Sequence, residues 1–351
     1  LHGITPATSP MHSPLDTDSI ALQYAFISNN PNPLGEKDQL TTSGNRTRYD
    51  QLHEKLHPTL RHFLQEFGYY DIFIADPESG DIVYSVYKEL DFSTSLKDGP
   101  YADTSIGKAF RGAMQLNKPG ETYLADFEIY PPSYDAPASF IATPIFNNGI
   151  KAGILIFQMP IEDMNAIMTE RSGMGDTGES YLVGPDLLMR SDSYLDPVNH
   201  NVAASFRYPD KGRVDTEAAR AALAGENSSR IIIDYNGNPV VSAFMPVDIG
   251  GITWALLAEQ DVAEAYAPVY QLRTTIIIAS VLCALLVCAL AWWFAKLLSK
   301  PITQMRDAII AAEKTGAFSH KVEYNSRDEF GEMARAFNSF LMTLARMFPD
   351  T

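Results

Sequence analysis

Residues 121–160, ETYLADFEIYPPSYDAPASFIATPIFNNGIKAGILIFQMP, decide the fold of this chain. Three runs rich in β-branched and aromatic residues, at 121–130, 138–147 and 150–160, have the composition of β-strands. Asn147-Asn148-Gly149 separates the last two runs and is a tight-turn signal, because Asn and Gly tolerate positive φ angles. The stretch therefore predicts three consecutive antiparallel strands.

The segment before these strands predicts two more strands and two helices. Residues 69–76 and 81–90 are strand-like runs joined by Pro-Glu-Ser-Gly, so they predict a β-hairpin. A short helix is expected at 105–116. Around 46–66 apolar side chains recur at three- and four-residue steps, which predicts an amphipathic helix that Gly68 ends. Residues 69–160 are thus expected to form a five-stranded sheet with helices on one face.

A shortened copy of this order follows along the chain. Residues 161–178 are expected to connect the two copies, with a helix at 161–171. Two αβ modules in tandem, 69–160 and 179–265, give an α+β fold with an internal repeat. The second copy is predicted as a strand pair at 179–186 and 187–194, a helix at 216–224, and three strands at 228–235, 239–247 and 253–261.

The composition narrows the class of protein. A chain of 351 residues suggests two or three structural units at roughly 150 residues each, and 46% hydrophobic residues suffice for a packed core. The 27 Lys+Arg against 43 Asp+Glu give a net charge of −16, which argues against a nucleic-acid binder because phosphate neutralisation needs a basic surface. Cys283 and Cys288 are the only cysteines in the sequence, which excludes a disulfide-rich scaffold and a Cys-based zinc ribbon.

Thr274–Phe294, TTIIIASVLCALLVCALAWWF, is a run of 21 residues without charge, Pro or Gly. As a helix it spans about 30 Å, the hydrocarbon thickness of a bilayer, so 266–298 is expected to be a transmembrane helix with its flanks, a buried core helix being the alternative. Residues 273–351 hold nine Lys/Arg and seven Asp/Glu, whereas the preceding 272 hold 18 and 36. The positive-inside rule therefore places 1–273 outside the cytoplasm and 295–351 inside it.

The N-terminus predicts a piece of a longer protein. Leu1 is not a start methionine, and a region outside the cytoplasm needs an export signal or a first membrane helix before it. Residues 1–19 include three prolines and show no periodicity, so they are expected to be a disordered or non-native lead. Residues 20–68 are then the N-terminal helical segment.

Three longer strings carry a specific resemblance. They are GYYDIFIADPESGDIVYSVYKELDFSTSLKDGPYADT (68–104), FEIYPPSYDAPASFIATPI (127–145) and GMGDTGESYLVGPDLLMRSDS (173–193). All three resemble the double Cache (dCache_1-type) sensor domains of bacterial chemoreceptors, sensor kinases and cyclases. The resemblance covers roughly residues 20–265. It implies tandem PAS-like modules on a long N-terminal helix, with 69–160 as the membrane-distal module that holds a small solute.

Residues 299–351 resemble a HAMP domain. Pro301 opens one amphipathic stretch, Gly316 lies in the linker, and Asp328-Glu329-Phe330-Gly331-Glu332 begins a second stretch that Ser326 or Asp328 could cap. Each helix is too short and too one-sided to be stable alone. The resemblance implies a HAMP-type parallel coiled coil, a four-helix bundle from two chains, and hence a homodimer. Two helices lying on the membrane surface are the alternative.

Candidate ligand-binding groups gather in the distal module, in the loop after its second strand and along its third. Small-molecule sites combine apolar and aromatic walls with a few placed polar groups. In amino-acid-binding members of the Cache family an Arg/Trp/Tyr cluster holds the ligand carboxylate and an Asp after the third strand holds its ammonium. Asp135 is at that position, but Ser95-Leu96-Lys97 replaces the cluster. The candidate residues are Tyr84, Tyr87, Lys88, Asp91, Lys97, Tyr101, Phe127, Tyr130, Ser133, Tyr134 and Asp135.

The proximal module offers a smaller set of polar groups. Tyr181, Arg190, Asp192 and Ser205 could line a cleft, or they could tie this module to its neighbour. Mechanical coupling is the first expectation for them.

Two short motifs suggest other chemistry. His53-Glu54-Lys55-Leu56-His57 spells the HExxH pattern of zinc hydrolases, but Lys55 lies between the two imidazoles, Pro58 is expected to hold His57 out of helical conformation, and no third ligand is evident. Gly173–Gly178 spells GxGxxG with a helix before it and a strand after it, the reverse of the dinucleotide-binding order, so it predicts a turn. No catalytic residue, metal or cofactor is expected, and a zinc hydrolase is the remote alternative.

The sequence thus predicts a transmembrane receptor in the bacterial inner membrane. Its ligand is expected to be a small molecule of the amino acid, amine or carboxylate class. A methyl-accepting chemotaxis receptor is the first expectation, and a histidine kinase, nucleotide cyclase or phosphatase is the alternative, with the output module beyond Thr351. The other expected partners are a second copy of the chain, membrane lipid and cytoplasmic signalling proteins, and no nucleic acid.

Overall fold

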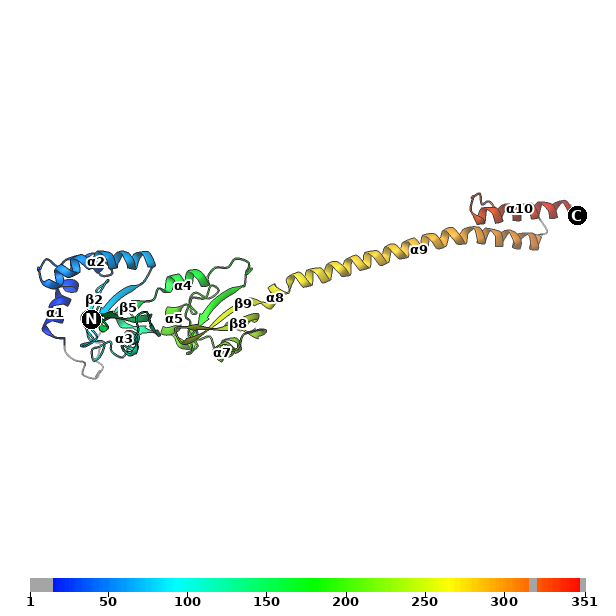
Figure 1. The fold of residues 1–351 in the computed structure, drawn as a ribbon. Helices are drawn as coiled ribbons and strands as arrows, with labels where there is room; N and C mark the ends of the chain where they lie inside the picture. The colour runs from blue at the N-terminus through cyan, green and yellow to red at the C-terminus, as the bar shows by residue number, and fades with distance from the viewer. Residues whose placement is uncertain (1–14, 316–320, 348–351) are drawn as a thin grey trace, which may run out of the picture. The chain divides into compact units, whose positions relative to one another are not determined.

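The computed structural model describes residues 15–315 and 321–347, except for the side chains of 312 and 315. It divides the chain into two compact units, Leu1–Ala265 and Tyr266–Thr351. Figure 1 shows the first unit as two sheet-containing modules and the second unit as helical. Residues 1–14 of the predicted lead at 1–19, and residues 316–320 of the predicted HAMP linker, lie outside the described residues.

The distal module holds a five-stranded antiparallel sheet in the order β2-β1-β5-β4-β3, and the sequence predicted all five strands. β2 ends earlier than predicted; beyond it the Asp71 carboxylate accepts hydrogen bonds from the Val86 and Tyr87 amides, and the Val86 amide also donates to the Ile72 carbonyl oxygen. The strands are β1 (Asp71–Ala75), β2 (Ile82–Ser85), β3 (Tyr123–Tyr130), β4 (Ala136–Asn147) and β5 (Ile150–Gln158).

Alternation along the central strands divides their side chains between two faces. Phe73 of β1 packs in the cluster that contains α3 (Ser105–Gln115), whereas the adjacent Ile72 packs with Leu64 of α2 (Arg48–Phe67). Figure 1 shows α2 and α3 on opposite sides of the sheet. The prediction of helices on one face is therefore wrong, because the N-terminal helix returns to cover the second face.

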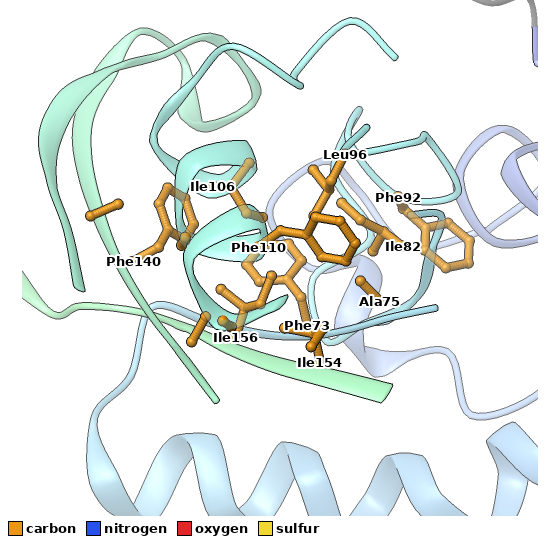
Figure 2. Close-up of a cluster of buried hydrophobic side chains, with 14 of the residues drawn as sticks. Phe73, Ala75, Ile82, Phe92, Leu96, Ile106, Phe110, Phe140, Ile154 and Ile156 are labelled. Atoms are coloured by element: carbon orange, nitrogen blue, oxygen red, sulfur yellow. The ribbon is translucent and has the colours of Figure 1, made fainter. Parts of the chain in front are cut away.

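The larger cluster is the core of the distal module. Figure 2 shows Phe110 of α3 close to Phe73 and Ile154 from the sheet, with Leu96 and Ile106 beside it. Phe110 is 1% exposed, and burying a phenylalanine contributes about 1.5–3 kcal/mol to folding. This cluster packs α3 against the sheet.

The N-terminal segment contains elements that the sequence did not predict. α1 (Thr17–Gln23), which begins within the predicted lead, continues into a π-helical turn, η1 (Tyr24–Ser28), and a 3-10 turn, η2 (Lys37–Gln39), follows. Together with α2 they form the predicted helical segment before the sheet.

α2 runs through Pro58 without a break, so the prediction that Pro58 holds His57 out of helical conformation is wrong. Tertiary contacts outweigh the local preference. The ring of His57 is buried between the Asp38 carbonyl oxygen, which accepts from Nε2 at 2.6 Å, and the Tyr84 hydroxyl, which donates to Nδ1 at 2.8 Å. These hydrogen bonds keep His57 in helical conformation, directly before Pro58.

The proximal module holds a four-stranded antiparallel sheet in the order β6-β9-β8-β7. The strand predicted at 187–194 is wrong: that segment makes only isolated bridges, Leu188 to Arg213 and Met189 to Val183, although the Arg190 amide still donates to the Leu182 carbonyl oxygen of β6. α5 (Val202–Arg207) and α6 (Pro209–Gly212) were not predicted. The remaining elements are α4 (Ile161–Met168), β6 (Glu179–Val183), α7 (Glu217–Leu223), β7 (Ser228–Ile233), β8 (Pro239–Ile249), β9 (Ile252–Asp261) and α8 (Val262–Ala265).

The second unit consists of two helices and the segment between them. α9 (Ala267–Thr315) contains Pro301 and runs through it, so the membrane run and the first predicted HAMP helix are one helix rather than two. Its Ala267–Ala311 part is long and apolar enough to cross a membrane. α10 (Glu329–Met347) begins after Asp328, which accepts from the Gly331 amide at 2.8 Å, as predicted for a cap. Met305 and Ala308 of α9 pack with Ala334 of α10.

We expect Phe110→Ala to destabilise the distal module by about 3–5 kcal/mol, because it leaves a cavity between α3 and the sheet. The matched control is Ile150→Ala in the β4–β5 turn, where the side chain is 73% exposed and little contact is lost. Urea unfolding of the chain in detergent, followed by circular dichroism, measures both. Equal loss in the two variants would contradict the core assignment.

Candidate ligand-binding site

A cavity of about 230 Å³ opens beside the segment that follows β2. Its walls are mainly apolar and aromatic, and the charged groups on them are Lys37, Lys88 and Glu89. The backbone turns sharply here, with Lys88 at φ 56°. The apolar and aromatic lining residues are Ile27, Leu34, Tyr87, Leu90, Pro131, Pro132 and Tyr134.

Carboxylates gather at and behind this cavity. Asp71 and Asp91 are fully buried, and Glu89 is half-buried. Asp91 accepts a hydrogen bond from the Tyr130 hydroxyl through Oδ2, and Glu89 accepts from the Ser133 hydroxyl at 3.1 Å. Ser133 in turn accepts from the Gln158 amide nitrogen at 3.2 Å. β1, the loop after β2, β3 and β5 thus contribute to one buried polar group.

Burial dominates the proton affinity of these carboxylates. Burial, followed by the charge of Asp91, raises the pKa of Glu89 to about 7. Burial raises the pKa of Asp91 to about 6, against a lowering by the Tyr130 hydrogen bond. Burial, followed by the charges of Asp91 and Glu89, also raises the pKa of Asp71 well above its usual range. Each group therefore resists ionisation while no cation compensates it.

Lys88 lies beside the carboxylates without pairing with them. Its ammonium donates to the Ser85 carbonyl oxygen and lies 4.4 Å from the centre of the Tyr84 ring. Burial lowers the pKa of this buried lysine to about 7. Lys88 is thus held by aromatic rings and a backbone carbonyl rather than by an acid.

The structure brings most of the predicted site residues together. Tyr87, Lys88 and Tyr134 line the cavity. Tyr84 does not line it, but its ring packs against the ammonium of Lys88. The other members of the group lie in the buried layer behind the cavity or next to it: Asp91, Tyr130 and Ser133 as described, and Tyr101, whose ring centre is 6.0 Å from that of Tyr130.

Three predicted residues lie elsewhere. Lys97 is on the surface and donates to the Glu78 carbonyl oxygen. Asp135 is exposed, in a left-handed conformation with φ 58°, and does not line the cavity. Phe127 is buried in the core of the proximal module, with its ring centre 6.0 Å from that of Trp254. Phe127 therefore belongs to the junction between the modules.

The structure adds Asp71, Glu89 and Gln158 to the site. The sequence held one usable signal, a charged Asp71 at the start of an otherwise apolar strand. Glu89 and Gln158 had no such signal, because each lies at the end of a segment where polar residues are ordinary.

Arg190 ties the two modules together. It is 1% exposed, and its Nε and Nη2 bind both oxygens of Asp126 on β3 at 2.8 Å each. A Cβ on Gly184 would lie 2.1 Å from the guanidinium carbon, so any larger residue there would push the Arg190 guanidinium from its present position. The predicted coupling role of Arg190 agrees with this geometry. Tyr181 and Ser205 are buried within the proximal module, and Asp192 accepts from Val202 N and Asn165 Nδ2.

Three of the four ring nitrogens in the HExxH string are hydrogen-bonded within the fold, and the fourth, His53 Nε2, is buried without a partner among the described residues. Both ring nitrogens of His57 are hydrogen-bonded, and His53 donates to the Thr41 carbonyl oxygen at 2.8 Å. Burial, followed by the charge of Lys88, lowers the pKa of His53 to about 3 and of His57 to about 4. Across 15–315 and 321–347, no group of three His, Cys, Asp or Glu could hold a metal ion. The stacked rings, 4.4 Å apart, pack α2 on the sheet.

Residues 293–346 match the HAMP domain family. This segment is a HAMP domain. The methyl-accepting chemotaxis protein PctB of Pseudomonas aeruginosa is 28% identical over 141 residues, which are 38% of this chain and 22% of PctB. The sensor protein kinase WalK of Staphylococcus saprophyticus is 29% identical over 130 residues, 36% of this chain and 21% of WalK. The chain spans about a fifth of the length of these two relatives.

The solved ligand-binding domain of PctB from Pseudomonas aeruginosa PAO1, in complex with L-Arg, is similar over 71% of this chain and 90% of that chain. The identity is 16% and the TM-score 0.41. Tandem αβ modules, one long apolar helix and the HAMP domain follow in the order that the sequence predicted.

We expect Arg190→Ala to destabilise the junction between the sensor modules by about 3–5 kcal/mol, because it leaves the Asp126 carboxylate without its partner. Arg190→Ala with Asp126→Ala should recover part of that loss, and the coupling energy follows from the double-mutant cycle. The control is Arg220→Ala, which breaks an exposed pair with Asp215 and should change little. If the losses in the free energy of unfolding of the two single variants simply add in the double variant, the Arg190–Asp126 pair does not stabilise the junction.

We expect Glu89→Gln to become increasingly stable relative to the wild type between about pH 4.5 and 7. The pKa of Glu89 is raised on folding, so its contribution is complete below its usual pKa of 4.5 and is lost as the pH rises through 7. The variant lacks that loss, and the difference should level off above pH 7. The measurement is the difference in melting temperature between the two proteins at each pH. His53 and His57 are present in both proteins, so their titration does not affect this difference. A pH-independent difference would contradict the assignment.

Proposed function

We propose that this chain is the sensing and relay part of a transmembrane chemoreceptor, and that a small solute binds in the cavity of its distal module. The observation that carries the proposal is the cavity itself, an apolar and aromatic enclosure with Glu89 on its wall and buried polar groups behind it. Its volume of about 230 Å³ is below the range of about 300–1,000 Å³ typical for drug-sized ligands, which favours a small metabolite.

The path from the cavity toward the proximal module runs along β3. Tyr130, at its end, binds Asp91 behind the cavity, while Asp126 and Phe127, earlier in the strand, engage Arg190 and the proximal core. A ligand that moves Asp91 or Glu89 would displace β3 at both places. Two-state signalling requires such an element, shared by the site and the output.

The HAMP domain supports the transfer of the signal to a second copy of the chain. Ile302 and Ile309 of α9 and Phe340 of α10 are more than half exposed in the single chain. A parallel bundle of two chains would bury such side chains. The positive-inside rule favours the sensor outside the cytoplasm of a bacterium and the HAMP domain inside it.

A sensor kinase is the second candidate. The similarity to WalK favours it over a nucleotide cyclase or a phosphatase, because WalK is a sensor kinase by name. The two candidates share the ligand site and the HAMP domain and differ in the output module.

We expect a small amine, amino acid or carboxylate to raise the melting temperature of the full chain in lipid nanodiscs, because a ligand that binds only the folded state stabilises it. Leu90→Trp should abolish the effect by filling the cavity that Leu90 lines. Ile150→Trp, at an exposed turn outside the cavity, is the matched control and should retain it. Stabilisation that survives Leu90→Trp would place the ligand elsewhere, and no stabilisation by any of the three classes would contradict the proposed receptor.

A further inference from the structure

Two lysines without an acidic partner follow the membrane-spanning run of α9. Lys296 and Lys300 lie two and six residues after Phe294, where the uncharged run ends. Both are exposed, and neither forms an ion pair in the described part of the chain. No Asp or Glu occurs in the sequence between Glu264 and Asp307. The positive charge of the two lysines is therefore not compensated by neighbouring residues of α9.

Trp292 extends the two lysines into a stripe toward the membrane. Trp292, Lys296 and Lys300 recur at four-residue steps, so their side chains share one face of the helix. The ammonium of Lys296 lies 4.1 Å from the centre of the Trp292 ring, a cation–π contact. Because an ammonium group has three N–H donors, this contact leaves donors available to an anion.

The stripe faces away from the side of α9 that packs in the HAMP domain. Met305 and Ala308 of α9 pack with Ala334 of α10. Lys296 is nine residues before Met305, and nine residues turn a helix by about 900°, which is two and a half turns. α9 is continuous through Pro301, so Lys296 points to the side opposite Met305. A bundle that forms on the Met305 side leaves the stripe open to lipid.

The spacing of the two ammonium groups suits one phosphate. Four residues of α-helix rise about 6 Å, and side chains on a helix lean toward its N-terminus, here toward the bilayer. A phosphate between Lys296 and Lys300 can accept a charge-assisted hydrogen bond from each. Trp293 and Leu285, on the apolar run, are more than half exposed and can contact acyl chains.

We propose that Trp292, Lys296 and Lys300 bind an anionic phospholipid, whose headgroup phosphate bridges the two lysines and whose acyl chains lie along the apolar run. This inference goes beyond the proposed receptor function: it rests on the membrane span and is independent of the distal cavity. An anionic headgroup is favoured over a zwitterionic one, because the cation of a zwitterionic headgroup would meet two lysines. The bound lipid would hold α9 where the match to the HAMP family begins, at residue 293.

Tryptophan quenching by lipids with brominated acyl chains tests the site. Two of the three tryptophans, Trp292 and Trp293, lie at it, whereas Trp254 is 3% exposed in the core of the proximal module and gives a constant background. The full chain is placed in phosphatidylcholine vesicles that contain equal fractions of either brominated phosphatidylglycerol or brominated phosphatidylcholine. We expect the phosphatidylglycerol to quench the fluorescence more strongly.

The decisive variant is Lys296→Gln with Lys300→Gln. A basic residue close to an anionic membrane surface contributes about a fivefold factor to binding, so the double change should lower the relative affinity for phosphatidylglycerol by more than about tenfold. Lys296→Arg with Lys300→Arg keeps both charges and should retain the preference. The matched control is Lys314→Gln with Lys321→Gln, which removes the same charge farther along the chain from the apolar run and should also retain it.

Four results would overturn the lipid site. Equal losses in the stripe variant and the matched control would indicate a diffuse surface charge. Loss of the preference in inorganic phosphate, but not in chloride of equal ionic strength, would indicate a site for free phosphate. Equal quenching by the two lipids in the wild type would also overturn the site, and it would leave the receptor standing because the response to solutes is measured separately. Quenching by neither lipid would contradict the membrane span itself.

Discussion

The buried carboxylate of Asp71 is the constraint on which the distal site depends. It stands at the first position of β1 and accepts from the Ile72, Val86 and Tyr87 amides, which holds the two residues that follow β2 against the start of β1. If β2 continued to residue 90 as a strand, Lys88 and Glu89 would point to opposite faces of the sheet. The turn instead puts Lys88 in left-handed conformation and lets both side chains line one cavity. Burial at this turn raises the pKa values of Asp71, Glu89 and Asp91, so ionising each of these carboxylates costs free energy.

β3 then joins this site to the second module through an irregularity in its register. The pairing with β4 shifts between Ala125 and Glu128. Strict alternation would put Ala125 and Tyr130 on opposite faces, but both lie in the distal core, and Phe127 between them enters the proximal core. A bulge changes the direction in which the following side chains point. Here it allows one strand to contribute side chains to the cores of both modules. Asp126 at the same place binds the buried Arg190, so the junction is held by an ion pair and by packing together.

These features also mark the limit of prediction from sequence. Period-two alternation and turn residues sufficed for the five distal strands, because those signals are local. The bulge at Phe127, the early end of β2 at Ser85 and the straight helix through Pro58 each depend on a partner far along the chain. The same holds for the site: aromatic and polar residues near 84–101 could be found by composition, but the burial of Glu89 and Gln158 could not. Asp135 had the expected position in the sequence, yet a 3-10 turn at Pro131–Ser133 and two left-handed residues after it direct the segment outward.

The turn at 173–178 binds Glu264 in α8, close to the end of the first unit. Glu264, next to the boundary at Ala265, accepts from the Asp176 and Thr177 amides at 2.8 Å and from the Thr177 hydroxyl at 2.5 Å. These hydrogen bonds lower the pKa of Glu264 to about 2, so it stays ionised across the physiological range. Arg171 binds three carbonyl oxygens of the same turn, and a Cβ on Gly178 would lie 2.0 Å from the Met174 carbonyl oxygen. The glycines that resemble a dinucleotide motif therefore serve a different purpose. They shape a turn whose amides bind Glu264, so α8 is hydrogen-bonded directly to the proximal module.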